Sequence, residues 1–536
     1  MSDVQFGFTA WPVDAAARYR AAGYWRGETL GDLLRIWSSR FAAATAVVDG
    51  DTRLSYHQLD RLVDERAAGL SALGVGAGDR LVVQLPNSAE FVVLLFALAR
   101  IGAVPVMALP AHRRTEIEHL ASLSEAVGYV VADTHQGFDY RTLAAQIVEL
   151  VPTVRHILVD GDPGPFTSLA AVAASTPTEA MFVDPAGIAV LLISGGTTGK
   201  PKLIPRTHDD YAFNARASAE LCRLASDDRY LVSLPAAHNF PLACPGILGA
   251  LGVGATVVMC PAPSADVALP LIAREQVTVT ALVPPLARLW VEAAPFANAD
   301  TSTLRLLQIG GAKLDPGLAG RIPEALGAQV QQVFGMTEGL LNYTRLDDPV
   351  ALVENTQGRP LCSADEVRVV DPDGHDVASG EVGELVTRGP YTLRGYYRAP
   401  EYNATAFSPD GWFHTGDLVR ALSSGHLVVE GRVKDVVNRG GENVSASELE
   451  ELLLGHPGVA AAAVVGLPDE MVGEIVCAVV VPGPNGPPML RELKAFLGER
   501  GLARFKHPDR LVIVDELPLT AIGKIDKRDV VERLGR

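Results

Sequence analysis

The stretch ISGGTTGKPK, residues 193–202, is an apolar run that breaks into a loop of serine, threonine and glycine and ends in Lys-Pro-Lys. Glycine lets a backbone approach a ligand closely and turn its N–H groups toward one point, as phosphate-binding loops do. The hydroxyl and ammonium groups also suit a polyanion better than a packed core. A solvated Gly/Ser turn is the alternative interpretation. The stretch therefore predicts a phosphate-binding loop.

The loop does not match the Walker A pattern. That pattern requires Gly, four residues and then Gly-Lys-Ser/Thr, whose hydroxyl binds magnesium. Ser194 stands at the position of the first glycine, and Pro201 follows Lys200. Proline lacks an N–H donor and disfavours a helical conformation at the residue before it. We therefore expect a phosphate loop of another kind.

Strand-like and helix-like segments alternate on both sides of this loop. Apolar runs at 80–85 and 104–109 flank an apolar helical segment at 89–101, which is typical of a βαβ unit with a buried parallel sheet. Another helix is predicted at 29–41. Further strands are predicted at 46–49, 128–132, 156–160, 188–193, 230–233, 256–260, 278–283 and 304–309. Buried strands interleaved with helices predict a layered α/β architecture.

The pattern changes toward the C-terminus. From about Gly383 the strands become shorter and turns more frequent, which predicts a small β-rich subdomain. An independent α+β pattern follows a boundary near 431–435. It has helices at 447–454 and 489–500 and strands at 459–465, 474–481 and 510–514. We therefore predict a large N-terminal domain, residues 1–433, and a smaller C-terminal domain, residues 434–536.

Composition limits the kinds of partner. The 536 residues are 48% hydrophobic and 20% charged, as in well-packed globular proteins, and the net charge of −17 argues against a general nucleic-acid binder. The five cysteines are scattered, without metal-site spacing. The N-terminus has no secretory pattern, and the apolar runs are too short to span a bilayer. We expect a cytoplasmic protein with no nucleic-acid or membrane partner.

Four further motifs follow the opening loop: FGMTEG (334–339), GWFHTGDL (411–418), GRVKDVVNRGGENVSASELE (431–450) and PLTAIGKIDKR (518–528). In this order and spacing they resemble the adenylate-forming superfamily of acyl-CoA synthetases, luciferases and nonribosomal peptide adenylation domains. The resemblance covers essentially the whole chain. It implies an ATP- and Mg²⁺-dependent joining of a carboxylate to AMP. Such a reaction brings two anions together, which requires a phosphate loop, a magnesium carboxylate and a positioned lysine.

The resemblance also implies which residues bind the nucleotide. Glu338 corresponds to the magnesium ligand, and Thr337 to an α-phosphate contact. Asp417 would accept hydrogen bonds from the ribose hydroxyls, supported by Arg432. A surface glutamate after a turn and a turn aspartate are the simpler alternatives. The β- and γ-phosphates and the adenine ring would be held by Ser194, Gly195, Gly196, Thr197, Thr198, Gly199 and Lys202, and by Gly310, Gly311, Ala312, Val333, Phe334 and Gly335, respectively.

The C-terminal motifs imply catalysis and domain movement. Lys524 corresponds to the catalytic lysine that bridges the carboxylate and the α-phosphate, whereas Lys527 and Arg528 are expected to be solvated. Lys434 falls at the hinge about which the superfamily rotates its C-terminal domain between two half-reactions. Gly440 and Gly441 would then line a tunnel for a phosphopantetheine arm. Many relatives carry lysine where this chain has Asn443.

The segment AAHNFPLACPG, residues 236–246, is the most informative about the acid. Amino-acid-activating relatives have aspartate at the position of Asn239, where it pairs the substrate ammonium. A buried ammonium without a carboxylate partner is costly, so an α-amino acid is disfavoured. A neutral amide can instead hydrogen-bond a hydroxyl or a carboxylate. His238 and Asn239 followed by Phe240, with GMTEGLLNYTRLDDP (335–349), resemble the stand-alone aryl-acid ligases of siderophore biosynthesis.

Two positions separate the aryl acids within that group. Salicylate enzymes have cysteine and leucine at the positions of Cys244 and Leu341, as here, whereas 2,3-dihydroxybenzoate enzymes usually have serine and valine. A thiol behaves as a small hydrophobe, so it offers little to a 3-hydroxyl group. Ordinary packing is the alternative reading of both residues. Gly311 would complete the acid pocket, and His238 would shape and gate it.

We therefore predict a ligase that forms salicyl-AMP and pyrophosphate and then passes the salicyl group to the phosphopantetheine thiol of an aryl carrier protein. The chain ends at Arg536 soon after Lys524 without a carrier module, so the carrier is expected to be a separate protein. The alternatives are a 2,3-dihydroxybenzoate-AMP ligase, an aryl-CoA ligase that uses free CoA, and a catalytically silent acyl-adenylate or nucleotide sensor.

Overall fold

The computed structural model describes residues 7–174, 182–194, 201–439, 442–469, 473–500, 502, 504–520 and 523–534, without the side chains at 434, 438, 442, 443, 473 and 505. The chain divides into two compact units. Apart from residues near 200, the first unit contains the chain up to Glu366 together with Arg388–Phe413. The second unit contains Val367–Thr387 and the chain from His414 onward. Each unit is described separately below.

The larger sheet of the first unit has nine strands in the described part of the chain, and its central strands are parallel. Antiparallel strands form both edges. The order is β18 (Arg359–Pro360), β17 (Leu341–Tyr343), β16 (Gln329–Gly335), β15 (Leu306–Gly310), β14 (Val279–Leu282), β12 (Arg229–Val232), β13 (Thr256–Met259), β1 (Thr45–Asp49) and β2 (Thr52–Ser55). The central strands are buried apolar runs because helices cover them.

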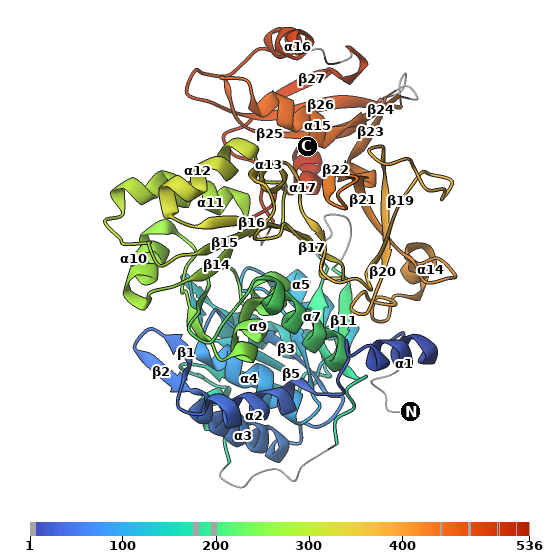
Figure 1. Ribbon diagram of the computed structural model, residues 1–536. Helices are drawn as coiled ribbons and strands as arrows, with labels where there is room; N and C mark the ends of the chain where they lie inside the picture. Colours follow the sequence, from blue (N-terminus) through green and yellow to red (C-terminus); the bar gives the residue numbers. More distant parts are fainter. Residues whose placement is uncertain are drawn as a thin grey trace. The chain divides into compact units, whose positions relative to one another are not determined.

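Helices α10 (Ala265–Glu275), α11 (Pro284–Ala293) and α12 (Pro316–Leu326) lie beside strands β14, β15 and β16 (Figure 1). Their apolar faces form one hydrophobic core with the sheet, in which Trp290, Leu307 and Ile322 are completely buried. Helices α8 (Asn239–Ala243), α9 (Gly246–Val253) and α13 (Val350–Asn355) also belong to this part of the chain. The predicted acid and adenine residues lie at the carboxyl ends of β12, β15 and β16 and in the segments that follow them.

A second sheet in the first unit has seven strands among the described residues. Its order is β11 (Leu203–Thr207), β10 (Ile188–Ile193), β4 (Val104–Met107), β3 (Arg80–Gln84), β5 (Gly128–Ala132), β8 (His156–Asp160) and β9 (Thr167–Ser168). All pairs are parallel except β10 with β11. Helices α5 (Arg114–Ser124) and α6 (Tyr140–Leu150) pack on it and bury Leu120 and Ile147.

Helices α2 (Leu30–Phe41), α3 (Tyr56–Ala72) and α4 (Ala89–Arg100) pack against one another. Helix α4 is buried from Phe91 to Arg100, which explains why it is apolar on all sides. Arg100 at its end forms ion pairs of 2.5 and 2.6 Å with Asp60 and Asp64 of α3. The unit also contains α1 (Val13–Ala21), α7 (His208–Leu221) and α14 (Pro400–Ala406).

The second unit contains two further sheets. One consists of β19 (Glu366–Val370), β20 (Val382–Arg388), β21 (Phe413–Ala421) and β22 (Leu427–Arg432). The strand-end residues Glu366, Arg388 and Phe413 are assigned to the first unit. The other contains β24 (Glu442–Ser445), β23 (Val436–Arg439), β26 (Gly473–Pro482), β25 (Val459–Asp469) and β27 (Arg510–Ile513). Helices α15 (Ala446–Leu454) and α16 (Leu490–Glu499) pack on one side of it, and α17 (Lys527–Leu534) packs against β25.

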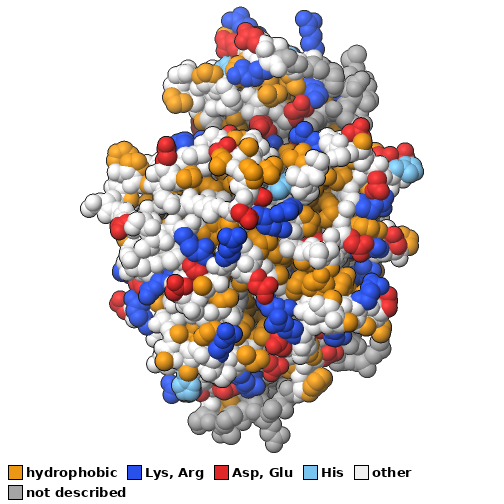
Figure 2. Space-filling model, in the orientation of Figure 1, with side chains coloured by type: hydrophobic (Ala, Val, Ile, Leu, Met, Phe, Trp, Pro, Cys, Tyr) orange, Lys and Arg blue, Asp and Glu red, His pale blue; other side chains and the backbone are white. Residues whose placement is uncertain are grey.

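The predicted fold class is confirmed: layered α/β sheets precede a short β-rich segment and a small α+β module. The domain boundary at 433/434 stays a prediction, since the contact-based division groups the β-rich sheet with the C-terminal module. None of the described helices is long and apolar enough to cross a membrane. On the face shown in Figure 2, Lys/Arg and Asp/Glu side chains are interspersed.

Candidate active site

The neck of the predicted phosphate loop is a hairpin between β10 and β11. Ile193 pairs with Leu203, and the neck closes through Ser194 N–H to Lys202 O at 2.9 Å and Lys202 N–H to Ser194 Oγ at 3.0 Å. A Walker A loop leads from a strand directly into a helix, whereas here α7 begins only after β11. This agrees with the rejection of a Walker A reading. The loop residues Gly195, Gly196, Thr197, Thr198 and Gly199 lie outside the described residues.

The segment with Thr337 and Glu338 is the tight turn between β16 and β17. Met336 N–H donates to Leu340 O at 3.3 Å, and Gly339 N–H donates to Met336 O at 3.1 Å. Glu338 is half-buried near the tip of this turn. A carboxylate oxygen is the hard donor that Mg²⁺ prefers, so the residue type fits the predicted metal ligand. Its role as the magnesium ligand stays a prediction.

The predicted adenine and acid residues meet at the ends of β15 and β16. Gly310 pairs with Val333, and a Cβ on Gly310 would lie 2.7 Å from Val333 O and 3.0 Å from the ring of Phe240. Only glycine therefore fits between the strand and this ring. Gly335 lies against Leu341, because an added Cβ would lie 2.4 Å from Leu341 Cδ2 and would require that side chain to move. Gly311 is exposed with φ of +87°, and Phe334 is half-buried.

Asp417 and Arg432 face each other on adjacent strands of the second unit. They are paired in the register of β21 and β22, and Arg432 Nε donates to Asp417 Oδ1 at 2.9 Å. Burial raises the pKa of Asp417, while the charges of Arg432 and Lys524 act in the opposite direction. The carboxylate is therefore close to two cations, one of which is the predicted catalytic lysine.

Lys524 lies on a tight turn that its own backbone closes. Thr520 N–H donates to Lys524 O at 2.6 Å, Lys524 N–H donates to Thr520 Oγ1 at 3.2 Å, and Leu519 bridges to Ile525. Gly523 has φ of +78°, which explains the glycine before the lysine. The turn therefore fixes the backbone from which the Lys524 side chain extends.

The expectation that Lys527 is solvated is wrong. Its Nζ lies 2.9 Å from Glu450 Oε1 and 3.6 Å from Asp435 Oδ2, and its side chain is only 19% exposed. A lysine buried to this degree needs such partners. Arg528 is exposed and pairs with Glu532 one helical turn away, as expected of a surface charge.

The predicted hinge and tunnel residues are only partly described. The backbone at Lys434 belongs to a short 3₁₀ helix, Val433–Asp435, between β22 and β23. The side chains of Lys434 and Asn443, and the whole of Gly440 and Gly441, lie outside the described part of the chain. The hinge and the pantetheine tunnel therefore stay predictions.

Asn239 is the first residue of α8 and is 4% exposed. Tyr211 on α7 donates its hydroxyl proton to Asn239 Oδ1 at 2.9 Å, and Asn239 Nδ2 donates to Cys244 Sγ at 3.4 Å. His238 caps the same helix, because its Nδ1 accepts from Phe240 N–H at 3.2 Å. The predicted acid-binding residues are thus held by hydrogen bonds around one short helix.

Cys244 is a buried thiol rather than a thiolate. Burial raises its pKa to about 12, although hydrogen bonds from Asn214 and Tyr343 and the charge of Arg206 lower it. The thiol proton goes to Asn239 O at 3.5 Å. Tyr343 and Leu341 are two residues apart on β17 and therefore point to the same side of the strand. Leu341 therefore faces the same side of β17 as Tyr343, which is a neighbour of Cys244.

A buried polar network that the sequence did not reveal joins the turn between β16 and β17 to helix α8. Arg206 is fully buried and pairs with Asp210 at 2.7 Å. Its guanidinium also donates to Thr337 O at 3.2 Å and to Asn214 Oδ1 at 3.4 Å, and Asn214 Nδ2 donates to Ala243 O at 2.7 Å. Arg206 thus connects the turn that contains Glu338 with the helix that contains Asn239. Its position four residues after Lys202, at the end of the loop neck, was the only signal.

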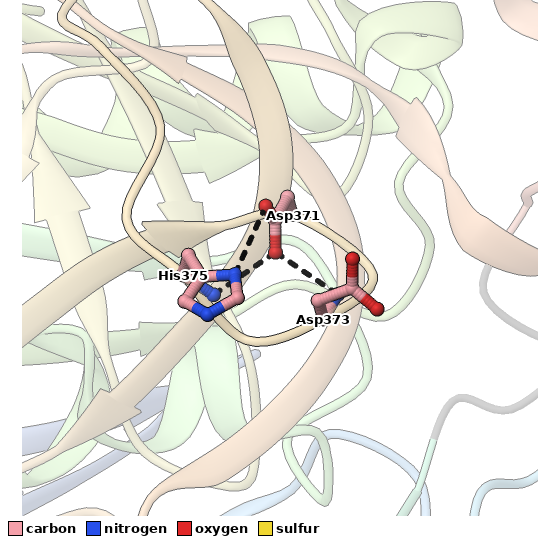
Figure 3. Close-up of side chains that lie close together, drawn as sticks. All are labelled: Asp371, Asp373 and His375. Atoms are coloured by element: carbon pink, nitrogen blue, oxygen red, sulfur yellow. Dashed lines mark hydrogen bonds and ion pairs between the residues drawn. The ribbon is translucent and has the colours of Figure 1, made fainter.

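One group of potential metal ligands lies elsewhere. Asp371, Asp373 and His375 come together on an exposed turn of the second unit (Figure 3). Asp371 Oδ1 accepts hydrogen bonds of 2.9 Å from the N–H groups of both other residues. This is the local bonding of an aspartate turn, so the cluster needs no metal to account for it.

These features belong to one class of protein. The model of the AMP-binding enzyme family matches residues 34–397, and the model of its C-terminal domain matches residues 448–524. The chain belongs to the AMP-binding enzyme family, and the resemblance to stand-alone aryl-acid-AMP ligases is confirmed.

The similar proteins within this family include two aryl-acid-AMP ligases. The chain is 55% identical to a salicyl-AMP ligase / salicyl-S-ArCP synthetase of Mycobacterium tuberculosis, over 99% of this chain and 95% of the relative. It is 49% identical to a 2,3-dihydroxybenzoate-AMP ligase of Bacillus subtilis, over 98% of each chain. The apo structure of MbtA from Mycobacterium smegmatis is similar with a TM-score of 0.79 and 54% identity, over 99% of this chain and 100% of that one.

Proposed function

We propose that this chain is a salicyl-AMP ligase. It activates salicylate with ATP, releases pyrophosphate and passes the salicyl group to the phosphopantetheine thiol of an aryl carrier protein in siderophore biosynthesis. The observation that carries the choice of acid is the pair Asn239 and Cys244. The amide oxygen of Asn239 is taken by Tyr211, so the amide offers N–H to the acid, and the neutral thiol beside it is a poor partner for a 3-hydroxyl group.

In the first half-reaction, a carboxylate oxygen of salicylate attacks the α-phosphorus of ATP while the bond to the β-phosphate breaks. Lys524 would bridge the attacking carboxylate and the α-phosphate, so that its charge offsets the negative charge that develops there. Asp417 would accept hydrogen bonds from the ribose, and the loop closed by Ser194 and Lys202 would hold the departing pyrophosphate. Glu338 would hold Mg²⁺, which neutralises phosphate charge when it is bound.

In the second half-reaction, the carrier thiol attacks the salicyl carbonyl and AMP leaves. The relatives are consistent with this order, since one is named both salicyl-AMP ligase and salicyl-S-ArCP synthetase. We propose a separate carrier protein as the partner and rotation about Lys434 as the movement between the two steps. A reducing, cytoplasmic compartment fits the five cysteines, all of which are free thiols.

A 2,3-dihydroxybenzoate-AMP ligase is the second candidate, and the 49% identical relative of that name favours it. The geometry around Cys244 favours salicylate. A 3-hydroxyl group placed against a thiol loses its water without gaining a strong partner, which costs on the order of 1–3 kcal/mol. The expected selectivity is therefore a preference rather than a complete exclusion.

Product analysis distinguishes the acceptors. We would supply enzyme, ATP and salicylate with either a phosphopantetheinylated aryl carrier protein or free CoA, and follow the thioesters by mass spectrometry. The proposal predicts salicyl-carrier thioester with CoA at most a poor substitute. Faster formation of salicyl-CoA would make the chain an aryl-CoA ligase. Binding of ATP and salicylate without any adenylate would instead indicate a silent sensor.

A further inference from the structure

The segment between Leu393 and Tyr402 connects the two predicted nucleotide-binding motifs of the first unit. Leu393 N–H donates to Glu338 O at 2.7 Å, and Tyr397 N–H donates to Leu203 O at 2.9 Å in an isolated bridge. The first contact is on the turn that contains the predicted magnesium ligand. The second is on the strand that begins immediately after Lys202. One segment therefore fixes the spacing of both motifs.

Two tyrosines of this segment contact the functional groups directly. Tyr396 Oη donates to Glu338 Oε1 at 2.8 Å. The ammonium of Lys202 lies 3.8 Å from the ring centroid of Tyr402 and 5.6 Å from that of Tyr396. The carboxylate and the lysine are thus held by neighbouring rings, which pack edge to face with their centroids 5.1 Å apart.

Tyr396 is itself rigidly placed. Only 4% of its surface is exposed, and its backbone is bonded at both ends to the amide of Asn403, with N–H to Oδ1 at 2.8 Å and Nδ2 to the carbonyl at 2.9 Å. Its ring also contacts Phe407 and Phe413. A hydroxyl fixed in this way can hold a carboxylate in one orientation, as the hydrogen-bonded partners of metal ligands do.

We propose that Tyr396 and Tyr402 are positioning residues of the nucleotide site. Tyr396 orients the carboxylate of Glu338 toward the metal, and Tyr402 holds the ammonium of Lys202 ready for the phosphates. The inference rests on the proposed function, in which Glu338 binds Mg²⁺ and Lys202 binds ATP. It adds an aromatic pair from the segment GYYRAPEY, residues 395–402, to the residues that prepare this site.

The arrangement has a physical reason. Glu338 Oε1 accepts from Tyr396, and this hydrogen bond fixes the plane of the carboxylate and therefore the direction in which its oxygens point. An ammonium over an aromatic face is attracted by the ring, and this attraction holds the Lys202 side chain in one place.

The test is the binding of α,β-methylene-ATP, measured by calorimetry with Mg²⁺ and with EDTA. The dissociation constant with EDTA, divided by that with Mg²⁺, reports how much the metal contributes to binding of the analogue. The measurement requires neither turnover nor an aryl acid. Y396F removes only the hydroxyl, and we expect it to reduce this ratio about tenfold, as loss of a metal ligand's partner does. Y56F is the matched control, because Tyr56 is buried and donates to Ala255 O at 2.7 Å far along the chain from either motif.

A double-mutant cycle tests the role of Tyr396 even if Y396F lowers the stability of the protein. In an E338Q background, Y396F should cause no further loss of the metal contribution, since the carboxylate that it orients is gone. An equal loss in both backgrounds, or a wild-type ratio in a folded Y396F, would overturn the role of Tyr396.

For Tyr402 the cycle pairs Y402L with K202M and measures affinity for the same analogue. We expect the two losses to be strongly non-additive, with Y402F close to the wild type because phenylalanine keeps the aromatic face. Additive losses would overturn the role of Tyr402. These results are distinct from the proposed function, which fails only if the wild-type enzyme binds the analogue but shows no activity with aryl acids.

Discussion

Tyr211 donates its hydroxyl proton to Asn239 Oδ1 at 2.9 Å, and in the proposed acid pocket this contact leaves the N–H side of the amide for the substrate. One N–H of the amide is directed to Cys244 Sγ, and the other remains a donor. A donor at this place suits the oxygen atoms of salicylate and offers nothing to the ammonium of an amino acid. The two residues are 28 positions apart, on α7 and α8.

Asn239→Asp should therefore inactivate the enzyme toward salicylate. The substitution keeps the shape but replaces an N–H donor with a buried negative charge beside an anionic substrate. We expect kcat/KM to fall at least about 100-fold, corresponding to about 3 kcal/mol. Salicylate-dependent pyrophosphate exchange measures this. N355D is the control, since Asn355 is exposed on α13 and should tolerate the same change. Activity near the wild type in N239D would refute the assigned contact.

Cys244→Ser should move the preference toward 2,3-dihydroxybenzoate. A hydroxyl can donate to and accept from a 3-hydroxyl group, whereas the neutral thiol does so weakly. We expect the ratio of kcat/KM for the two acids to change by about 10- to 100-fold, or 1–3 kcal/mol. The control is C260S. Cys260 is also buried and donates to Ala262 O, and we expect its replacement to leave the ratio for the two acids unchanged. A constant ratio in C244S would mean that Cys244 only fills space.

Lys524→Ala should separate binding from chemistry. We expect adenylation to fall by at least about 100-fold, since electrostatic stabilisation by one positioned group is typically of that size. Binding of salicylate and ATP should largely survive, as should the transfer of preformed salicyl-AMP to the carrier. Arg528 provides the control, because it is an exposed cation four residues away and R528A should be neutral. Unchanged exchange in K524A would show that this lysine is not catalytic.

Asp365 should make stability depend on pH. Its carboxyl is buried, Oδ2 accepts from Tyr391 at 2.7 Å and from Cys362 N–H at 3.1 Å, and Oδ1 has no hydrogen-bond partner among the described residues. Burial raises its pKa to about 7. Between the unfolded pKa near 4 and this value, folding takes up a proton, so the free energy of unfolding falls as pH rises.

The expected loss across that window is about 4 kcal/mol. Asp365→Asn removes the titrating group, so relative to the wild type it should gain stability as the pH rises from about 5 to 8. Urea denaturation at several pH values measures this difference. D300N, at an exposed aspartate whose pKa is lowered, should run parallel to the wild type over the same range. Parallel curves for D365N would show that Asp365 is ionised in the folded protein.

The sequence predicted most of the parallel strands because each is an apolar run between turn residues, but it did not predict β9 or β16, and β16 contains three glutamines. It did not predict β11, since Pro205 within LIPRT argues against a strand. The structure explains the exception, because β11 is an edge strand of its sheet. Edge strands tolerate proline where central strands do not.

The motifs named the candidate site residues, but not the residues that contact and orient them. The contacts of Tyr211, Arg206 and Tyr396 join segments far apart in the chain, and no local pattern encodes them. The same limit explains Lys527, whose basic neighbours indicated a solvated charge while its partners Asp435 and Glu450 lie 92 and 77 residues earlier. Local patterns predict elements and motifs, whereas tertiary pairing decides burial and orientation.

The most direct test is ATP–pyrophosphate exchange by the carrier-free protein with salicylate, 2,3-dihydroxybenzoate and benzoate in parallel. We predict exchange with salicylate at the highest kcat/KM, with 2,3-dihydroxybenzoate lower by about 10- to 100-fold because its 3-hydroxyl group is left without a partner. A clear preference for 2,3-dihydroxybenzoate would contradict the argument from Cys244 and Leu341. No exchange with any of the three acids would contradict the assignment as an aryl-acid ligase.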